Sequence, residues 1–305
     1  MTPRPRLIDF TGRRSAVGVC VALGGFDGVH IGHTAVLRRA VALARESGKI
    51  SVAFTFSAPP AAGNRLTGSL LSTLEEKQKL ISDVGIDAAA VADFRDFAGM
   101  SSGDFISDVL KGQLGATDTV CGLDFSFGKG RSGSFETLRS SFGDSAAAVA
   151  CVSSGGIPVS SSRIRSLLSR GCAEEAAVLL GRPYSLGGTV FAGRGDGRRI
   201  GFPTVNFRPD PEKQVLMPGV YISEIKTGDV FLPSVTDCGY APSLDSTGIY
   251  RCETHILSFD GKYPDEIAEV RFRAFLRPET RFPDTASLSA AIADDVKRAE
   301  SYFGI

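Results

Sequence analysis

The character of the sequence changes between residues 181 and 187, and the two patterns on either side are compatible with few folds. Before the change, short apolar runs alternate with segments of helical periodicity; after it, the segments are short and rich in turns, β-branched residues and aromatic residues. The strands expected in the first part are 16–23, 50–56, 88–91, 119–122 and 146–152, and the expected helices are 34–45, 74–84 and 104–114. Such alternation predicts a Rossmann-like α/β domain with a parallel sheet over residues 1–182. Residues 183–305 are expected to form a small antiparallel β-barrel that ends in an amphipathic helix over 287–302.

The composition fits two globular domains and argues against several classes of protein. The chain has 305 residues, 43% of them hydrophobic, and its 34 basic side chains balance 34 acidic ones. Zero net charge argues against nucleic acid or an anionic membrane as a partner, and no apolar stretch is long enough to predict a membrane span. The six cysteines show no paired metal-ligand spacing and no secretory signal is evident, so reduced thiols and a cytoplasmic location are expected. The sequence leaves a homo-oligomer open.

A glycine-rich turn between the first expected strand and the first expected helix forms the first candidate site. It reads Gly24-Gly25-Phe26-Asp27-Gly28-Val29-His30-Ile31-Gly32-His33. Glycines allow a tight turn and a close approach of the backbone to a ligand, and the amides at the start of the following helix favour an anion. A single histidine is most often structural, but two of the three histidines in this chain fall in this turn. We therefore expect both imidazoles to face a bound phosphate, since a two-histidine metal site lacks a third ligand at an obvious spacing.

Two later segments are expected at the same edge of the sheet. Asp124 follows an expected strand, where its carboxylate either faces a ligand or caps a turn. Residues 159–165 read Val-Ser-Ser-Ser-Arg-Ile-Arg. Serines that open a helix can cap it or bind a phosphate, and the two arginines add permanent charge. For Ser160, an ordinary helix cap is the simpler explanation.

The His-x-Gly-His spacing and the later Ser-Ser-Ser-x-Ile-Arg run resemble the nucleotidylyltransferase superfamily. The stretches 25–33 and 122–128 are more specific and resemble the prokaryotic bifunctional riboflavin kinase/FAD synthetases. The resemblance implies that the phosphate of FMN attacks the α-phosphorus of ATP without a covalent enzyme intermediate, so that the protein acts by positioning and stabilising charge. It assigns catalysis to His30 and His33, and flavin or nucleotide binding to Asp124. It assigns the binding of ATP and its phosphates to Gly24, Phe26, Gly28, His30, His33, Ser161, Ser162, Arg163 and Arg165.

The start of the expected barrel forms the second candidate site. Glycines at 193, 195, 197 and 201 are interspersed with arginines at 194, 198 and 199, which suits either a basic flap over a polyphosphate or an ordinary glycine-rich hairpin. The stretch 201–206, Gly-Phe-Pro-Thr-Val-Asn, resembles a signature of riboflavin kinases. The resemblance implies that Gly193, Gly201, Thr204 and Asn206 bind the nucleotide, and that the side-chain oxygens of Thr204 and Asn206 hold Mg²⁺.

Residues 251–257 resemble the strand that presents the general base of these kinases. Glu253 is then the residue that takes the proton from the riboflavin 5′-hydroxyl as it attacks the γ-phosphate of ATP. Without the preceding motif, a solvent-facing strand glutamate would be the default interpretation. The implied substrates and products are ATP, riboflavin, FMN and FAD. Because every implied kinase residue lies within 183–305, this fragment is expected to fold and to phosphorylate riboflavin alone.

The resemblance runs from about residue 17 to residue 303, with departures in four places. Gly25 stands where the family usually has Asn, and the segments 57–60, 237–243 and 260–265 also differ from the usual pattern, with Asp237 in place of another usual Asn. Two other functions stay open at this point. A nucleotidylyltransferase with a different acceptor leaves 201–206 unexplained, and a flavin-binding regulator with altered sites is opposed by the presence of both histidines and Glu253.

Overall fold

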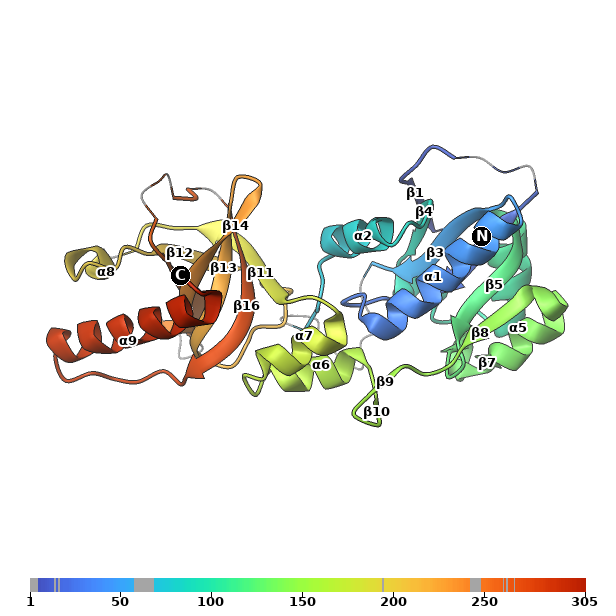
Figure 1. Ribbon diagram of the computed structural model, residues 1–305. Coiled ribbons are helices and arrows are strands. Elements are labelled where there is room, and N and C mark those ends of the chain that lie inside the picture. The colour runs from blue at the N-terminus through green and yellow to red at the C-terminus, as the bar shows by residue number, and fades with distance from the viewer. Residues whose placement is uncertain are drawn as a thin grey trace. The chain divides into compact units, whose positions relative to one another are not determined.

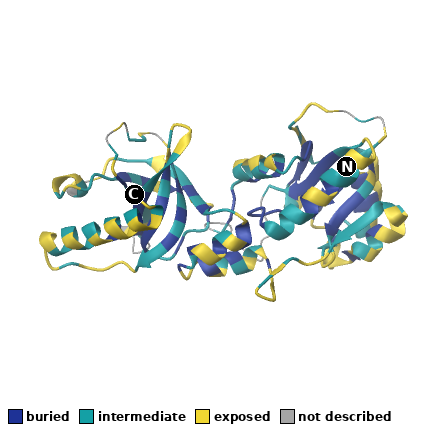
Figure 2. Ribbon diagram, viewed as in Figure 1, coloured by how far each residue is buried: buried dark blue, intermediate teal, exposed yellow. Residues whose placement is uncertain are grey.

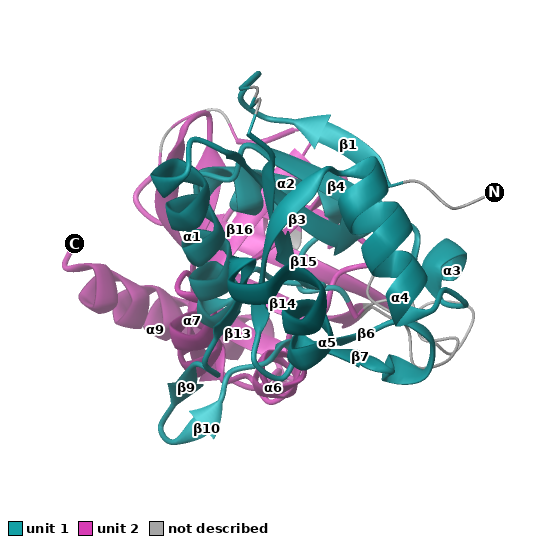
Figure 3. Cartoon of the chain, turned by 90° about the vertical axis from the view of Figure 1, so that its right-hand side faces the viewer, with its two compact units in different colours: residues 1–66, 70–161 teal, residues 67–69, 162–305 magenta. Residues whose placement is uncertain are grey.

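The computed structural model describes residues 5–13, 15, 17–57, 69–193, 195–241, 248–259, 261, 263–265 and 267–305. Contacts divide the chain into two compact units, residues 1–66 with 70–161 and residues 67–69 with 162–305 (Figure 3). The division falls just inside helix α6 (Ser161–Leu168), so most of α6 and all of α7 (Ala173–Leu180) belong to the second unit. The functional boundary that we expect between residues 182 and 183 stays a prediction.

The first unit is built on a six-stranded sheet with the strand order β1-β4-β3-β2-β5-β8 (Figure 1). The strands are β1 (Arg6–Asp9), β2 (Val19–Leu23), β3 (Ile50–Phe56), β4 (Ala88–Ala92), β5 (Ala116–Gly122) and β8 (Ala146–Val149). All neighbours pair in parallel except β1, which runs antiparallel to β4 at the edge. The chain continues from β2 to β3 on one side and later enters β5 on the other side of β2. The carboxyl end of β2 is therefore the switch point at which ligands of such sheets bind.

Helices cover both faces of this sheet. The longest of them, α1 (Ile31–Glu46), packs with α2 (Leu74–Asp83) on one face through a cluster that includes Leu37, Ala40 and Ile81. The π-helical segment η1 (Phe105–Gln113) and α5 (Phe135–Phe142) pack on the other face through Phe105, Val109 and Leu138, among others. Figure 2 shows the strands between these layers as largely buried. The remaining short elements are α3 (Phe94–Phe97), α4 (Ser102–Asp104), η2 (Lys129–Arg131), η3 (Gly143–Ser145), and the pairs β6 (Ser126–Phe127) with β7 (Gly133–Ser134) and β9 (Ser153–Ser154) with β10 (Ile157–Pro158).

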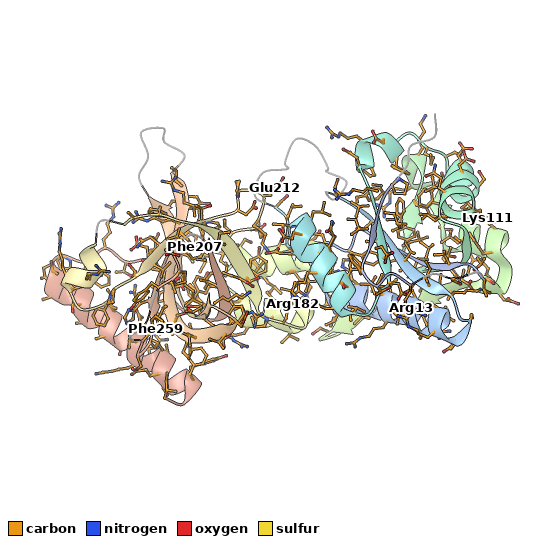
Figure 4. All side chains as sticks on the ribbon, turned by 90° about the horizontal axis from the view of Figure 1, so that it is seen from above. Arg13, Lys111, Arg182, Phe207, Glu212 and Phe259 are labelled. Carbon is orange, nitrogen blue, oxygen red and sulfur yellow. The ribbon has the colours of Figure 1, made fainter. Side chains whose placement is uncertain are left out.

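The second unit contains a closed barrel of six antiparallel strands in the order β11-β12-β15-β14-β13-β16. They are β11 (Tyr184–Val190), β12 (Val205–Pro209), β13 (Gly219–Thr227), β14 (Val230–Ala241), β15 (Ile249–Ile256) and β16 (Ile267–Arg277). Phe207 is fully buried inside the barrel (Figure 4). Hydroxyl groups form a buried chain there, in which Ser223 contacts Ser234 and Thr236, and Thr236 contacts Thr254, at 2.7–2.9 Å. The barrel interior thus contains these polar hydroxyl groups, each of which has a hydrogen-bond partner.

The last helix, α9 (Thr285–Phe303), packs on the outside of the barrel. Ala299, Val296 and Phe303 lie in one cluster with Val220 and Ala274 of the strands. The buried carboxylate of Asp295 pairs with the guanidinium of Arg277 at 2.7 Å, which fixes the helix to the end of β16. A short helix, α8 (Asp196–Arg199), lies in the glycine-rich segment between β11 and β12.

The fold class expected from the sequence, an α/β sheet followed by an antiparallel barrel and a final helix, is confirmed. The expected start of α1 at residue 34 was three residues late, because His30 caps the helix with its imidazole instead of a hydroxyl or carboxylate. The expected helix 104–114 is a π-helical segment preceded by α4. The edge strand β1 carries charges at both ends and was missed. Helix α7 ends with Gly181 in the left-handed region (φ +73°), which is why the pattern changes there.

Candidate functional site

The turn between β2 and α1 is fixed by hydrogen bonds to its neighbours at the carboxyl edge of the sheet. The Thr55 hydroxyl donates to the carbonyl oxygen of Gly25 at 2.9 Å, and the Gly28 amide donates to the Ser72 hydroxyl at 3.0 Å. Thr55 belongs to β3, and Ser72 precedes α2. The turn is therefore held from two sides and presents a defined backbone at the switch point.

Asp27 is a residue of this turn to which the sequence analysis gave no role. Its carboxylate accepts hydrogen bonds from the amides of Leu71 (3.0 Å) and Ser72 (3.2 Å), and only 4% of the residue is exposed. Its backbone carbonyl accepts a hydrogen bond from the Ser161 hydroxyl at 2.9 Å. Asp27 thus ties the turn to the segment before α2. A carboxylate would repel a bound phosphate. Its presence in a turn that is expected to bind an anion was therefore the signal that Asp27 has a structural role.

The backbone of the turn is strained at two buried residues. Phe26 and Val29 adopt φ values of 47° and 38°, which side chains other than glycine rarely adopt. Each such conformation costs about 1–3 kcal/mol and persists only when the surroundings impose it. Gly24 is required for another reason, because a Cβ atom there would lie 2.7 Å from the Phe26 ring. At Gly25, where the family usually has Asn, a Cβ atom would meet nothing within 4 Å.

His30 and His33 stack on each other at the start of α1, with ring centroids 3.6 Å apart and planes 14° from parallel. The Nδ1 atom of His30 accepts the backbone amide of His33 at 3.2 Å, so the proton of a neutral His30 lies on Nε2. Burial holds the pKa of His33 well below its usual value, and the nearby His30 and Lys77 lower it further. The Nδ1 atom of His33 is buried and has no hydrogen-bond partner in the described part of the chain. Two neutral imidazoles therefore stand at the positive end of a helix of 16 residues.

The other predicted residues of the first site are distributed between the two units. Asp124 is exposed just beyond β5. Its carboxylate lies close to the backbone of Gly122, where a Cβ atom would be 2.9 Å from the Oδ1 atom. Ser161 is in the first unit, and its hydroxyl contacts the turn itself through Asp27. Ser162, Arg163 and Arg165 follow in the second unit on α6, where the Arg165 guanidinium donates to the carbonyl of Ser69. The structure thus brings Gly24, Phe26, Gly28, His30, His33 and Ser161 together, and a role for Ser162, Arg163 and Arg165 in this site stays a prediction.

The second candidate site is a pocket of about 180 Å³ beside β11 and β12 of the barrel. Its lining includes Gly193, Arg198, Thr204, Asn206 and Tyr263. The Asn206 amide nitrogen donates to the Thr204 hydroxyl at 3.2 Å, so the amide oxygen of Asn206 is available to a ligand. A Cβ atom on Gly193 would lie 2.7 Å from the Asn206 side chain, so glycine is needed here for close packing. Arg194 lies outside the described residues, and Tyr263 was not anticipated from the sequence.

Gly201 adopts φ +89° between α8 and β12, a conformation that suits glycine. It lies three residues before Thr204 and lets the chain turn from α8 into the motif. Gly201 does not itself line the described pocket, so its part in nucleotide binding stays a prediction. The glycine-rich segment is in part an ordered helical turn.

Glu253 lies on β15 directly opposite Asn206 of β12 and Asp237 of β14 in the strand register. Its carboxylate is about one-third exposed and pairs with the guanidinium of Arg251 at 3.0 Å. Neighbouring residues Cys252 and Thr254 are fully buried, so Glu253 and Asn206 are on the outer face of the barrel. The structure thus places the predicted general base on the strand next to a predicted metal ligand.

Asp237 is an acidic neighbour of Glu253, and it stands where the family usually has an uncharged Asn. Loss of hydration, followed by the nearby carboxylates of Glu279 and Glu253, raises the pKa of Asp237 to about 6. Arg277 and Arg251 oppose this effect. A Cβ atom on Gly239 would lie 1.9 Å from the Glu279 carboxylate, which shows how closely Glu279 approaches β14.

His255, the third histidine of the chain, anchors the kinase motif. Its Nδ1 atom is hydrogen-bonded to the carbonyl oxygen of Pro203 at 2.9 Å, and its ring contacts Phe202 edge-on at 5.5 Å. The residue that precedes Thr204 is thereby tied to the strand that carries Glu253. No role for His255 was predicted, although its position two residues after Glu253 places both side chains on one face of the strand.

Comparisons with known proteins agree in both halves of the chain. Residues 13–163 match the FAD synthetase family, and residues 180–303 match the riboflavin kinase family. The bifunctional riboflavin kinase/FMN adenylyltransferase of Listeria monocytogenes is 31% identical over 93% of this chain and 92% of its own length. The protein of the same description from Escherichia coli K12 is 32% identical over 94% of each chain, and that from Bacillus subtilis is 30% identical over 93% and 92%.

One solved structure is similar over almost the whole chain. It is described as a macrolide-efflux protein from Streptococcus pneumoniae, and it superimposes with a TM-score of 0.85 at 26% identity, covering 94% of this chain and 95% of its own. In the described part of this chain, no helix is long and apolar enough to cross a membrane. The fold is thus shared with that structure, while the sequence relatives span both halves at 30–32% identity. This chain belongs to the bifunctional riboflavin kinase/FMN adenylyltransferase family.

Proposed function

We propose that the two activities of this chain, riboflavin kinase and FMN adenylyltransferase, reside in two separate sets of residues. Adenylyl transfer, which makes FAD, is assigned to the turn before α1. Phosphoryl transfer, which makes FMN, is assigned to the pocket beside β11 and β12. The stacked, neutral imidazoles of His30 and His33 at a helix N-terminus are the observation that carries the first assignment. The Thr204–Asn206 pair beside Glu253 carries the second.

In adenylyl transfer, the turn acts by binding and orienting phosphates. An oxygen of the FMN phosphate forms a bond to the α-phosphorus of ATP, and the bond to pyrophosphate breaks. His30 presents its Nε2 proton as a donor, and the free amides at the start of α1 attract the same negative charge. Because the turn is strained and held from two sides, these donors need little rearrangement when charge develops in the transition state. Ser162, Arg163 and Arg165 are proposed to add charge for the β- and γ-phosphates, and Asp124 is proposed to contact the flavin or the nucleotide.

In phosphoryl transfer, Glu253 accepts the proton of the riboflavin 5′-hydroxyl while that oxygen attacks the γ-phosphorus of ATP, and the bond from the γ-phosphorus to the leaving ADP breaks. The ion pair with Arg251 orients the Glu253 carboxylate on the outer face of the barrel. Gly193 and Arg198 line the pocket, and Arg198 adds a positive charge there. Gly201 is proposed to contribute to nucleotide binding from the adjoining turn. The contact between His255 and Pro203 keeps Thr204 in register with Glu253.

The residues of this pocket fit a magnesium ion. Mg²⁺ prefers oxygen ligands and usually keeps several waters, so it needs few protein ligands besides the substrate phosphates. The Thr204 hydroxyl and the Asn206 amide oxygen are such ligands, and the bond between the two side chains leaves that oxygen available. When bound, the ion would neutralise phosphate charge.

The decisive experiment is a flavin assay. Purified protein is incubated with riboflavin, ATP and Mg²⁺, and the products are separated by chromatography. FMN and FAD should both form, EDTA should stop both reactions, and added Mg²⁺ should restore them. Formation of FAD only from added FMN would contradict the kinase assignment, and full activity in metal-free buffer would contradict the metal assignment. A cytoplasmic location and a homo-oligomer stay predictions from the sequence.

A further inference from the structure

Lys77 is a buried lysine that neither assigned site uses. It lies on α2 and is 1% exposed, whereas the side chain of Lys79 on the same helix is 75% exposed and pairs with Asp83. The Lys77 ammonium donates a hydrogen bond to the carbonyl oxygen of Phe56 at 2.8 Å. Phe56 is the last residue of β3, which pairs with β2. The ammonium is therefore buried at the carboxyl edge of the sheet, next to the strand that leads into the histidine turn.

No carboxylate in the described part of the chain forms an ion pair with the Lys77 ammonium, whose described hydrogen-bond partner is a carbonyl oxygen. Burial lowers the pKa of Lys77 to about 8, and the Asp27 carboxylate opposes this effect from a distance. That carboxylate already accepts the amides of Leu71 and Ser72. A buried cation without a matching anion lowers the stability of the free protein. The cost falls when an anion binds nearby.

The positive charge of Lys77 also acts on His33 of the histidine pair. Lys77 is one of the groups that hold the pKa of His33 down, after burial and His30. The charged and titratable groups that act here are thus His30 from the turn, Lys77 from α2, and Asp27, which is bound to amides. Together with the N-terminus of α1, the site combines a positive charge, a helix dipole and two neutral imidazoles. This combination favours a polyanion.

We propose that Lys77 is a positioning residue for adenylyl transfer: its buried ammonium adds to the effect of burial in disfavouring a charged His33, and it offsets the charge of the ATP phosphates at the start of α1. The proposal rests on the assignment of adenylyl transfer to His30 and His33. Lys77 acts through His33 and through its electric field, which water screens little in a buried site. The ligand class is a nucleotide polyphosphate.

The first test compares Lys77→Gln, Lys77→Arg and Lys79→Gln in the full chain, with FAD formation from added FMN as the readout. Gln keeps a donor for the Phe56 carbonyl but removes the charge, so KM for ATP should rise on the order of tenfold. Arg keeps the charge and should stay near the unchanged protein, and Lys79→Gln serves as the matched control on the exposed face of α2. FMN formation from riboflavin should be unchanged in all three, because the kinase residues lie in the other unit.

The second test measures the histidine charge directly. Nuclear magnetic resonance titration can follow the imidazoles individually, since the chain has only three histidines, and single substitutions assign them. Removal of a neighbouring cation should raise the pKa of His33 in Lys77→Gln and leave it unchanged in Lys79→Gln. A structural role for Lys77 alone would not move this titration. An unchanged His33 titration together with an unchanged KM for ATP would overturn the proposal.

A third measurement does not need Lys77→Gln and covers the case in which that variant does not fold. In the unchanged protein, kcat/KM for ATP in FAD formation should fall as the pH rises above about 8, because Lys77 then loses its charge. Lys77→Arg should keep its kcat/KM over that range, and a fall of equal size in both proteins would contradict the proposal. If His30→Ala and His33→Ala retain FAD formation, the site assignment itself fails. If they lose it while the pH profile shows no Lys77 dependence, only the inference about Lys77 fails.

Discussion

His30 accepts a hydrogen bond from the backbone of His33, and this bond determines where its proton lies. Burial keeps His33 uncharged at neutral pH. Two imidazolium ions stacked at 3.6 Å would repel each other strongly, so the arrangement is compatible with neutral rings that receive a phosphate. At the scale of single residues, the turn therefore supplies hydrogen-bond donors and a helix terminus, whereas fixed positive charge from Lys77, Arg163 and Arg165 belongs to the proposals above.

Replacement of either histidine should separate the two activities. His30→Ala removes the cap of α1 and the Nε2 donor, and His33→Ala removes the stacked ring. We expect FAD formation to be abolished in both, while FMN formation continues at the rate of the unchanged protein, because Thr204 and Glu253 are in the other unit. Chromatography of the flavins measures both products in one reaction. FAD formation at the unchanged rate in either variant would show that the site is misassigned.

Asp237 should make stability depend on pH. Its folded pKa is raised from 3.8 to about 6, so the folded protein binds this proton more tightly than the unfolded chain does. Its contribution to stability is therefore lost as the pH rises through this window. Asp237→Asn removes the effect, and its unfolding temperature should exceed that of the unchanged protein at pH 7.5 and equal it below pH about 4. Asp229→Asn, in the turn between β13 and β14, controls for the loss of one carboxylate. A difference that does not depend on pH would contradict the assignment.

At the scale of elements, the turn between β2 and α1 concentrates most of the first site in a few residues. Asp27, Thr55 and Ser72 fix it through hydrogen bonds, and Phe26 and Val29 stay in strained conformations because they are buried. Strain of this kind is tolerated where the surrounding structure imposes it. A small increase in side-chain volume should therefore disturb the turn strongly at Gly24 and hardly at all at Gly25.

Gly24→Ala and Gly25→Ala form a matched pair that tests this response. A methyl group on Gly24 would lie 2.7 Å from the Phe26 ring, whereas a methyl group on Gly25 would meet nothing within 4 Å. We expect Gly24→Ala to lower FAD formation by roughly one to two orders of magnitude, since small displacements of catalytic groups have effects of that size. Gly25→Ala should retain it, and FMN formation should be unaffected in both. Equal activities of the two variants would show that the Phe26 position does not matter.

Several elements were predictable because their sequence pattern and their burial agree. β3 was expected at its observed bounds, since a continuous apolar run is what a strand buried on both faces requires. Lys77 and Asp27 were not predictable in the same way. A lysine in an amphipathic helix normally faces solvent, and only the fold shows that the end of β3 receives its ammonium. His255 was missed because its partner is a backbone carbonyl 52 residues earlier in the chain.

At the scale of the whole molecule, the two units divide earlier than the sequence pattern indicates. Helices α6 and α7 precede the barrel strands in the sequence, but α6 contacts the segment before β13. The Met217 amide donates to the Leu168 carbonyl at 3.0 Å. A Cβ atom on Gly171 would lie 2.8 Å from the Met217 side chain, so the loop after α6 packs closely there too. The contacts that α6 and the loop after it make with Met217, which lies outside the barrel strands, were not predictable from the sequence pattern.

The two architectures were predictable from the sequence. The predicted kinase residues Thr204, Asn206 and Glu253 lie on neighbouring strands of the barrel, but their roles stay predictions. Tyr263 in the pocket, the pairing of Arg251 with Glu253 and the contact of His255 with Pro203 were not anticipated.

Two fragments test where the kinase domain begins. Residues 183–305 contain the proposed kinase residues, so this fragment should phosphorylate riboflavin if it folds. Residues 162–305 also keep α6 and α7, and should unfold at a higher temperature because they retain the contact of Leu168 with Met217. Glu253→Gln in the active fragment should lower turnover by about 10²–10⁴. Equal unfolding temperatures of the two fragments would show that the helices contribute nothing to the barrel, and an active Gln variant would exclude Glu253 as the base.

One consequence follows from the hydrogen bond between His255 and Pro203. Strand β15 carries Glu253, the proposed proton acceptor, and two residues later His255, which is hydrogen-bonded to Pro203 just before Thr204. A slip of one residue in the pairing of β15 would turn both side chains to the barrel interior together. Insertions in the glycine-rich stretch from 193 to 201 leave this coupling untouched, because it runs across the strands instead of along the chain. Among related proteins, the spacing between 253 and 255 should therefore stay constant even where the length of that stretch differs.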